Sequence, residues 1–382
     1  MADELPRVVA RRFTIQACLG RGGFGEVYRA RMRAPSGIES IIALKVLRSD
    51  LGHDPSALGR LRDEARLLAS LDHPSILKVH DLVRLAGLTA LVAEYVDGDD
   101  WSTLIRSGDR VPIRVHLEIA ARVADALHAA WTARNEHGPL RLVHRDVKPA
   151  NIRVGRSGQV KLLDFGVAQF ESSIREARTS SDEIVGSLPY VAPERFRTRT
   201  VSGAVDVYSL GCILFHILAG MPLHPRANAR TISGLALDEA EWTRFLKDRI
   251  ATLPDRRFAD LLTAALSHDP ERRPTGDEFA SSLDVLANQR PELDLRAWAA
   301  QVTRLEPAKI DGALVGRILV EEGTVATATP SLAPAAAHPA LPIARTPISH
   351  DRFYNSGISC ALLVTAIGLV VVSVALAWRV MR

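Results

Sequence analysis

The hydrophobic pattern of this chain changes near residue 97, and this change constrains the fold more than any other feature. Strand-type patterns occupy residues 13–47 and 89–96, and only residues 56–70 between them have helical spacing. After this part the helical pattern dominates, in residues 113–134, 204–219 and 258–267. The sequence therefore predicts an α+β fold with two lobes, a small sheet-rich lobe with one main helix and a larger helical lobe.

Composition excludes several classes of protein. The chain has 382 residues, of which 47% are hydrophobic, so it can bury a large core and is not disordered throughout. Cys18, Cys212 and Cys360 lack the spacing of a disulfide framework or a metal site, as suits a reducing cytosol. The net charge of +4 is small for this length and the basic residues form no cluster, so no nucleic-acid partner is predicted.

A glycine-rich segment lies between two predicted strands. Residues 20–27, GRGGFGEV, follow the pattern G-x-G-x-x-G-x-V, in which glycines let the backbone approach phosphate groups. Alone, this pattern also fits a plain hairpin turn. Lys45 lies in the apolar strand that follows, where an unpaired charge is costly, and Glu64 on the helix of 56–70 is its candidate partner. An ordinary surface salt bridge is the alternative for either residue.

Five further motifs follow in a fixed order. They are HRDVKPAN at 144–151, Asp164-Phe165-Gly166, Ala192-Pro193-Glu194, DVYSLG at 206–211 and Arg273 within ERRP at 271–274. With the glycine-rich segment and Lys45, this set resembles the protein kinase family, and most of all the bacterial, eukaryotic-like serine/threonine kinases. The resemblance covers about residues 13–286. It implies the two-lobed kinase fold, with an antiparallel-sheet N-lobe at about 13–96 and a helical C-lobe at about 97–286.

The resemblance also implies roles for the matched residues. Asp146 would be the catalytic base, and Lys148 would neutralise charge on the transferred phosphoryl group. Asn151 and Asp164 would hold Mg²⁺, for which Mn²⁺ is a substitute, while Lys45 paired with Glu64 would bind the phosphates of ATP. The implied ATP-binding residues are Leu19, Gly20, Gly22, Gly23, Gly25, Val27, Ala43, Lys45, Ala93, Glu94 and Val96. The implied structural residues are His144, Arg145, Phe165, Gly166, Ser187, Glu194, Asp206 and Arg273.

The segment between the metal-binding motif and Ala192-Pro193-Glu194 resembles an activation loop. Lys148, two residues after the implied base, is typical of the serine/threonine class, and Ser187 occupies a position where that class usually has threonine. Arg145 resembles the arginine of kinases that are switched on by loop phosphorylation. Phosphate on one of the loop hydroxyls would add about two negative charges near it, which predicts activation by autophosphorylation at Thr179, Ser180 or Ser181. The alternative is that these are ordinary polar loop residues.

Three features depart from the common kinase pattern. Ala93 occupies the position of a larger gatekeeper residue, so we expect extra space behind the adenine site. Arg153 occupies a position where an apolar residue often packs under the adenine ring, although its aliphatic stem can still cover the ring. Residues 133–141 form a longer stretch than the family usually has, which we interpret as a loop insertion.

The motifs favour one function over two alternatives. Because every expected catalytic residue is present, the leading interpretation is an active serine/threonine kinase that phosphorylates proteins in signal transduction. A pseudokinase scaffold that acts by binding is the second hypothesis. A small-molecule phosphotransferase is the third, and the activation segment around Gly186-Ser187 and Ala192-Pro193-Glu194 argues against it.

The chain outside the kinase-like part suggests a membrane tether. Residues 358–378 are almost wholly apolar and long enough to cross a bilayer as one helix, after an Ala/Pro/Thr-rich stretch that predicts a disordered linker. We therefore predict a single-pass protein of the inner cell membrane with a cytoplasmic kinase domain and lipid contacts through the span. Homodimerisation stays open. The predicted segments outside the kinase domain are an N-terminal extension (1–12), a tail (287–322), the linker (323–357), the span (358–378) and a short end (379–382).

Overall fold

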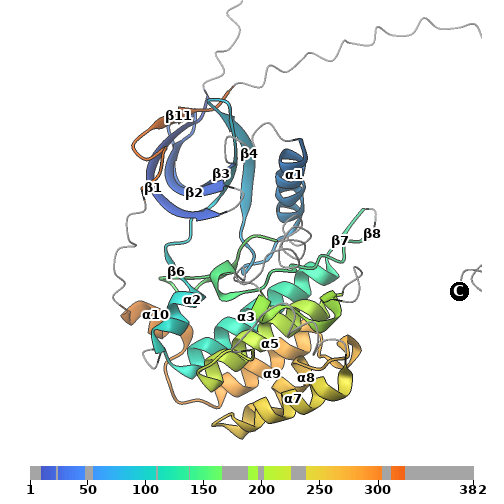
Figure 1. The fold of residues 1–382 in the computed structure, drawn as a ribbon. Helices are drawn as coiled ribbons and strands as arrows, with labels where there is room; N and C mark the ends of the chain where they lie inside the picture. Colours follow the sequence, from blue (N-terminus) through green and yellow to red (C-terminus); the bar gives the residue numbers. More distant parts are fainter. Residues whose placement is uncertain are drawn as a thin grey trace, which may run out of the picture. The chain divides into compact units, whose positions relative to one another are not determined.

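The computed structural model describes nine ranges of the chain: 10–22, 25–47, 55–108, 111–136, 138–165, 188–196, 202–224, 238–302 and 311–322 (Figure 1). The chain divides into two compact units, Met1–Thr324 and Val325–Arg382, and all described ranges belong to the first. The predicted linker at 323–357 and the predicted span at 358–378 lie outside these ranges. Among the helices that are described, none has the length and apolar character needed to cross a membrane.

The N-lobe is an antiparallel sheet whose strand order is β11-β1-β2-β3-β5-β4, with one helix beside it. The helix α1 (Pro55–Ser70) packs against β4 and β5. An antiparallel sheet with one main helix is the arrangement that the sequence predicts. The strands are β1 (Arg12–Gly22), β2 (Gly25–Arg33), β3 (Glu39–Leu47), β4 (Val79–Leu85), β5 (Leu88–Glu94) and β11 (Ile318–Val320).

Side chains of β3 point alternately into the core of this lobe and toward the opposite face of the sheet, where Ala43 and Lys45 line a cavity. Ile42, Leu44 and Val46 are buried in a cluster with Phe13 and other side chains of the sheet. Successive side chains of a strand point to opposite faces, so Ala43 and Lys45 face the other side. The same hydrophobic pattern that builds the core therefore turns Lys45 toward the cleft.

The C-lobe is mainly helical, and the long helix α3 (Ile113–Thr132) lies at its centre, packed against α5 and α9. A three-stranded sheet of order β10-β9-β6 and a small hairpin of β7 and β8 complete it. The other helices are α2 (Trp101–Arg106), α5 (Ala204–Ala219), α7 (Glu239–Ala251), α8 (Ala259–Ala265), α9 (Gly276–Asn288) and α10 (Leu295–Gln301). The short strands are β6 (Gly98–Asp100), β7 (Arg134–Asn135), β8 (Gly138–Pro139), β9 (Ile152–Gly155) and β10 (Val160–Leu162).

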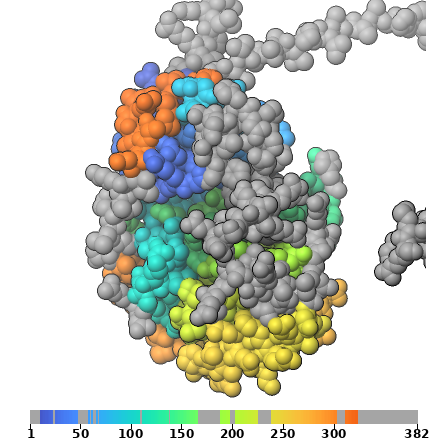
Figure 2. Space-filling model, in the orientation of Figure 1, coloured from blue at the N-terminus to red at the C-terminus, as the bar shows by residue number. Residues whose placement is uncertain are grey.

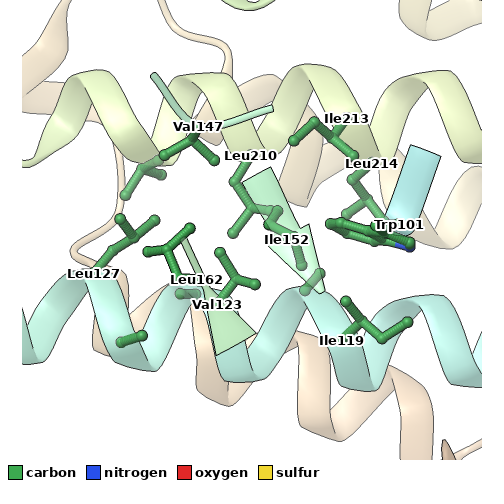
Figure 3. Close-up of a cluster of buried hydrophobic side chains, with 14 of the residues drawn as sticks. Trp101, Ile119, Val123, Leu127, Val147, Ile152, Leu162, Leu210, Ile213 and Leu214 are labelled. Atoms are coloured by element: carbon green, nitrogen blue, oxygen red, sulfur yellow. The ribbon is translucent and has the colours of Figure 1, made fainter. Parts of the chain in front are cut away.

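Buried side chains fix the catalytic-loop region between α3 and α5, as Figure 3 shows. Val147 lies in the loop, Ile152 begins β9 and Leu162 ends β10, and each is no more than 1% exposed. They pack in one cluster with side chains of α3 and α5, including Val123 and Leu210. Because a close-packed core resists displacement, the polar residues next to these three are held in place by hydrophobic packing.

The helices and strands that the sequence predicts lie close to observed ones, but the pattern does not predict β4, α7, α9 or the elements of the tail. The helix predicted at 204–219 has the bounds of α5, and the insertion predicted at 133–141 contains the hairpin of β7 and β8. Residues 287–322 were expected only as a tail without an assigned role. The structure instead gives them the helix α10, which contacts α3, and the strand β11, which joins the N-lobe sheet. Both elements are short, which is why periodicity does not reveal them.

Candidate active site

A cavity of ≈ 330 Å³ lies beneath the glycine-rich segment, between β1, β2 and β3 on one side and β9 on the other. Every predicted ATP-binding residue lines it except Gly23, which lies outside the described residues. Sequence reasoning missed several apolar residues of its wall, because nothing in their spacing separates them from core residues. These are Leu68, Leu77, Leu91 and Leu163.

Lys45 and Asp164 form an ion pair within this cavity. The Nζ atom of Lys45 lies 2.7 Å from Oδ1 of Asp164. Burial opposes ionisation of the Asp164 carboxyl, but the charge and hydrogen bond of Lys45 outweigh it and hold its pKa below the ordinary value. The predicted partner of Lys45 was Glu64, whose side chain lies outside the described residues, so that pairing stays a prediction.

Asp146 accepts two side-chain hydrogen bonds through a single oxygen, Oδ2. Lys148 donates from Nζ at 2.8 Å and Asn151 donates from Nδ2 at 3.0 Å. Asn151 also donates to the backbone carbonyl of Asp146 at 2.9 Å, which fixes the amide's orientation. The Asp146 side chain is only 9% exposed. The three residues that the resemblance places in the catalytic loop are therefore in mutual contact.

The backbone before Asp146 is held by the buried carboxylate of Asp206, in the first turn of α5. Its two oxygens accept hydrogen bonds from the backbone N–H groups of His144 at 2.7 Å and Arg145 at 2.8 Å. Burial raises the pKa of Asp206 above its usual value. Arg145 has a φ of +66°, a left-handed conformation that is costly for a residue with a Cβ. Asp206 therefore supports a strained turn next to the implied base.

His144 links the catalytic loop to the strand that leads to Asp164. Its Nε2–H donates to the carbonyl of Leu163 at 2.8 Å, and its Nδ1 accepts from the backbone N–H of Asp146 at 3.3 Å. In this arrangement Nε2 is the donor of the imidazole and Nδ1 is its acceptor. The ring also packs against Phe165 with centroids 4.7 Å apart. The two implied structural residues therefore join the two polar segments of the site.

Asn151 and Asp164 are brought together by the pairing of β9 with β10. Ile152 lies opposite Leu162 in this pair, and the backbone N–H of Leu163 donates to the carbonyl of Asn151 at 2.8 Å. Both side chains carry oxygen donors, and two such protein ligands are what Mg²⁺ usually takes beside phosphate oxygens and water. In the part of the chain that the structure describes, no cluster of three or more His, Cys, Asp or Glu residues offers another metal site. The donor set therefore fits Mg²⁺.

Glu194 and Arg273 form a bidentate ion pair in the C-lobe. The two terminal nitrogens of Arg273 lie 2.7 and 2.8 Å from the two oxygens of Glu194. The Arg273 side chain is fully buried and also donates to the carbonyls of Ser267 and Ala204. The pair implied by the resemblance is thus present in the structure.

Comparison with known proteins agrees with this geometry. The sequence profile described as "Protein kinase domain" matches residues 13–283. This chain belongs to the protein kinase family. Five further predicted site residues lie outside the described residues. They are the candidate phosphorylation sites Thr179, Ser180 and Ser181, and the structural residues Gly166 and Ser187.

Several bacterial kinases are similar to the chain. Tyrosine-protein kinase MasK of Myxococcus xanthus is 34% identical over 71% of this chain and 42% of its own length. Serine/threonine-protein kinase PknB of Mycolicibacterium smegmatis is 37% identical over 57% of this chain and 34% of its own, and PkaA of Streptomyces coelicolor is 32% identical over 80% and 57%. The chain thus spans between about a third and three fifths of the length of these curated relatives. The crystal structure of the Mycobacterium tuberculosis PknI kinase domain covers 72% of this chain and 95% of its own, with 28% identity and a TM-score of 0.48.

Arg153 lies in the wall of the cavity where the resemblance implies that the adenine ring binds. Its Nε donates to the carbonyl of Val96 at 2.9 Å, and its terminal nitrogen pairs with Asp100 at 3.1 Å. Arg153 and Asp100 both line the cavity. The guanidinium therefore bonds to Val96 and Asp100, where the two lobes join, and coverage of the adenine ring by the stem stays a prediction. The sequence does not reveal these contacts, because they depend on the pairing of β6 with β9.

Ala93, the last residue but one of β5, lines the cavity and is 5% exposed. A methyl group there leaves room for a bulky substituent, so we expect an ATP-site inhibitor that carries a naphthyl group to bind the native kinase well. Ala93→Met should weaken its binding by at least about tenfold, since the longer side chain fills that space. The measurement is displacement of a fluorescent nucleotide. A related inhibitor without the naphthyl group serves as the control, and equal binding of the bulky compound to both forms would contradict the gatekeeper assignment.

Proposed function

We propose that this protein is a serine/threonine protein kinase that transfers the γ-phosphoryl group of ATP to protein hydroxyls. The observation that carries the proposal is the position of Asp146, whose carboxylate contacts both Lys148 and Asn151. Ala150 and Asp164 of the same region line the cavity that holds Lys45. A candidate base with a cation beside it, and a nucleotide-sized cavity lined by Ala150 and Asp164, support the proposal.

The residues support a simple division of roles. Asp146 orients the substrate hydroxyl and accepts its proton, while the ammonium group of Lys148 reduces the negative charge on the transferred group. Lys45 binds nucleotide phosphates and is held in position by Asp164. Mg²⁺ bound by Asn151 and Asp164 would neutralise phosphate charge. Positioning and charge neutralisation account for the catalysis, as phosphoryl transfer requires little covalent help.

The choice of hydroxyl needs its own test. Lys148 and the names of PknB and PkaA favour serine and threonine, whereas MasK is named a tyrosine kinase. We therefore propose incubating the purified full chain with Mg²⁺, radiolabelled ATP and a generic basic protein, followed by phosphoamino acid analysis. Labelled phosphoserine or phosphothreonine is the expected product. Phosphotyrosine alone would overturn the proposed specificity.

Asp146→Asn is the matched control for this assay, because it keeps the size of the side chain but removes the base. The variant should lose transfer while it still binds nucleotide. A native chain that binds ATP yet transfers no phosphate would favour the alternative, a pseudokinase scaffold. Equal transfer by both forms would show that Asp146 is not the base.

Activation by autophosphorylation is part of the proposal. Support comes from the sequence, which has Thr179, Ser180 and Ser181 in the loop and Arg145 before the base. Intact-mass analysis after incubation with ATP should show added phosphate in the native chain and none in Asp146→Asn. Full activity with an unphosphorylated loop would overturn this part.

Attachment to the inner membrane is also proposed, with the kinase domain in the cytoplasm. Its support is the apolar run at 358–378, which is long enough for one span. Protease added to intact spheroplasts should leave the kinase domain undigested, and the protein should sediment with membranes. Recovery in the soluble fraction would contradict the tether. Crosslinking in the same membranes would reveal homodimers.

A further inference from the structure

The last described segment, residues 311–322, returns to the N-lobe beyond the end of the matched kinase domain at residue 283. Figure 1 shows β11 beside β1, although α10 lies in the C-lobe. The register pairs Phe13 with Leu319 and Thr14 with Ile318 in antiparallel fashion. We call residues 311–322 the strap.

The strap occupies both edges of the N-lobe sheet. It pairs with β1 along β11, and the next residue, Glu321, forms a bridge with Leu85 at the end of β4. The backbone N–H of Glu322 donates to the carbonyl of Arg84 at 2.9 Å. Without β11, the edge strands of the N-lobe sheet would be β1 and β4. The strap bonds to both of them, so it covers edges that would otherwise expose unpaired backbone groups.

Side chains fasten the strap to the sheet. Leu319 is 6% exposed and belongs to the N-lobe core with Phe13, whereas its neighbour Ile318 is 63% exposed. Arg11 forms a bidentate pair with Glu321, at 2.7 and 2.8 Å, and also pairs with Asp81 in β4. A buried leucine and a shared arginine therefore join the strap to both edge strands.

The other end of the strap reaches the glycine-rich segment. Arg21, which lies between Gly20 and Gly22 and lines the cavity, donates to the backbone carbonyl of Asp311. Arg21 also pairs with Glu26 at 2.6 Å, and Glu26 accepts a hydrogen bond from the buried Tyr28. Arg21 thus links the glycine-rich turn to the strap, and its pair with Glu26 joins the second strand of the turn to the same residue.

Gly312 makes this contact close. A Cβ added at Gly312 would lie 2.7 Å from Cε1 of Tyr28 and 2.9 Å from Cβ of Cys18, which is two residues before Gly20. Real Cβ atoms are not found this close to other atoms, so a side chain here would push the strap away from β1 and β2. Figure 2 shows the orange residues of the strap covering the blue strands on this face.

We infer that the strap is a positioning element for ATP, which holds the glycine-rich segment in the shape that binds the phosphates. The inference rests on the proposed function, because it concerns the same cavity. Among the contacts described above, those of Asp311 and Gly312 fall on Arg21, Cys18 and Tyr28, within or next to the glycine-rich segment, and none of them involves Arg153 on the opposite wall of the cavity. Its effect should therefore fall on the phosphate end of the nucleotide.

Binding of ATP and of adenosine to the full chain tests the inference. Gly312→Ala should weaken Mg²⁺–ATP binding by about tenfold but adenosine binding by less than about twofold, because only ATP carries the phosphates. In steady-state kinetics the same variant should raise the KM for ATP with little change in kcat. Ile318→Ala is the matched control, since its exposed side chain leaves the strap attached, and both affinities should stay at native values.

Each other outcome is decisive. Equal losses for ATP and adenosine, or no loss for either, would overturn the inference and leave the strap a purely structural element. Should Gly312→Ala not fold, Leu319→Ala replaces it, since a cavity loosens the strap without a clash. The same ATP-to-adenosine comparison then applies. A native chain that binds no ATP would overturn the proposed function itself.

Discussion

Replacing Asp206 with asparagine is expected to lower both the activity and the stability of this kinase. The two carboxylate oxygens accept from the backbone N–H groups of His144 and Arg145. An asparagine amide has only one oxygen, so it can accept from only one of these two N–H groups. The other N–H group would face the NH₂ group of the asparagine, which is also a donor. Loss of a buried charged hydrogen bond costs about 2–3 kcal/mol, and the turn at Arg145, with its φ of +66°, loses support. We expect kcat to fall by roughly 10²-fold, since Asp146, the proposed base, would shift from its productive position.

A matched control separates this effect from the general loss of a carboxylate. Asp238 also accepts from two backbone N–H groups, those of Ala240 and Glu241, but it does so at the exposed start of α7. Asp238→Asn should cost no more than about 1 kcal/mol, because asparagine is also a good helix cap. The measurements are chemical unfolding and ATP-dependent transfer. Equal effects of the two substitutions would contradict the role given to Asp206.

Much of the site could be predicted because kinase motifs carry their own local geometry. His144, Asp146, Lys148 and Asn151 lie within one short loop, so their spacing alone brings them together. Asp164 is placed next to Asn151 by the short antiparallel pair of β9 and β10. The order of the two lobes and the helices α1, α3, α5 and α8 also follow from the hydrophobic period, which is a strong signal in long elements such as α3 and α5.

The strap could not be predicted, for a physical reason. β11 has only three residues, two of them exposed, and its pairing with β1 joins residues that are far apart in the sequence, such as Phe13 and Leu319. No periodic signal exists in so short a strand, and the charge pairs of Arg11 are decided by the fold. The contacts of Arg153 were missed for the same reason, since its partners Val96 and Asp100 lie on the connection between the lobes.

Replacing Arg273 with alanine is expected to destabilise the C-lobe most among single substitutions at the described ion pairs. The substitution removes both hydrogen bonds to Glu194 and those to the carbonyls of Ser267 and Ala204. Glu194 is then left as an uncompensated carboxylate that is only 12% exposed. Breaking a buried pair in this way costs about 3–5 kcal/mol.

Two further variants show whether the pair itself is responsible. Arg273→Lys should recover part of the loss only, because an ammonium group cannot form the two parallel bonds of a guanidinium. The double variant Arg273→Met with Glu194→Met should be more stable than Arg273→Ala, since no buried charge remains without a partner. As a control, Arg31→Ala breaks the exposed pair with Glu39 and should cost about 0–1 kcal/mol. Chemical unfolding of all four gives the comparison. A double variant less stable than Arg273→Ala would show that the remaining carboxylate is not the source of the instability.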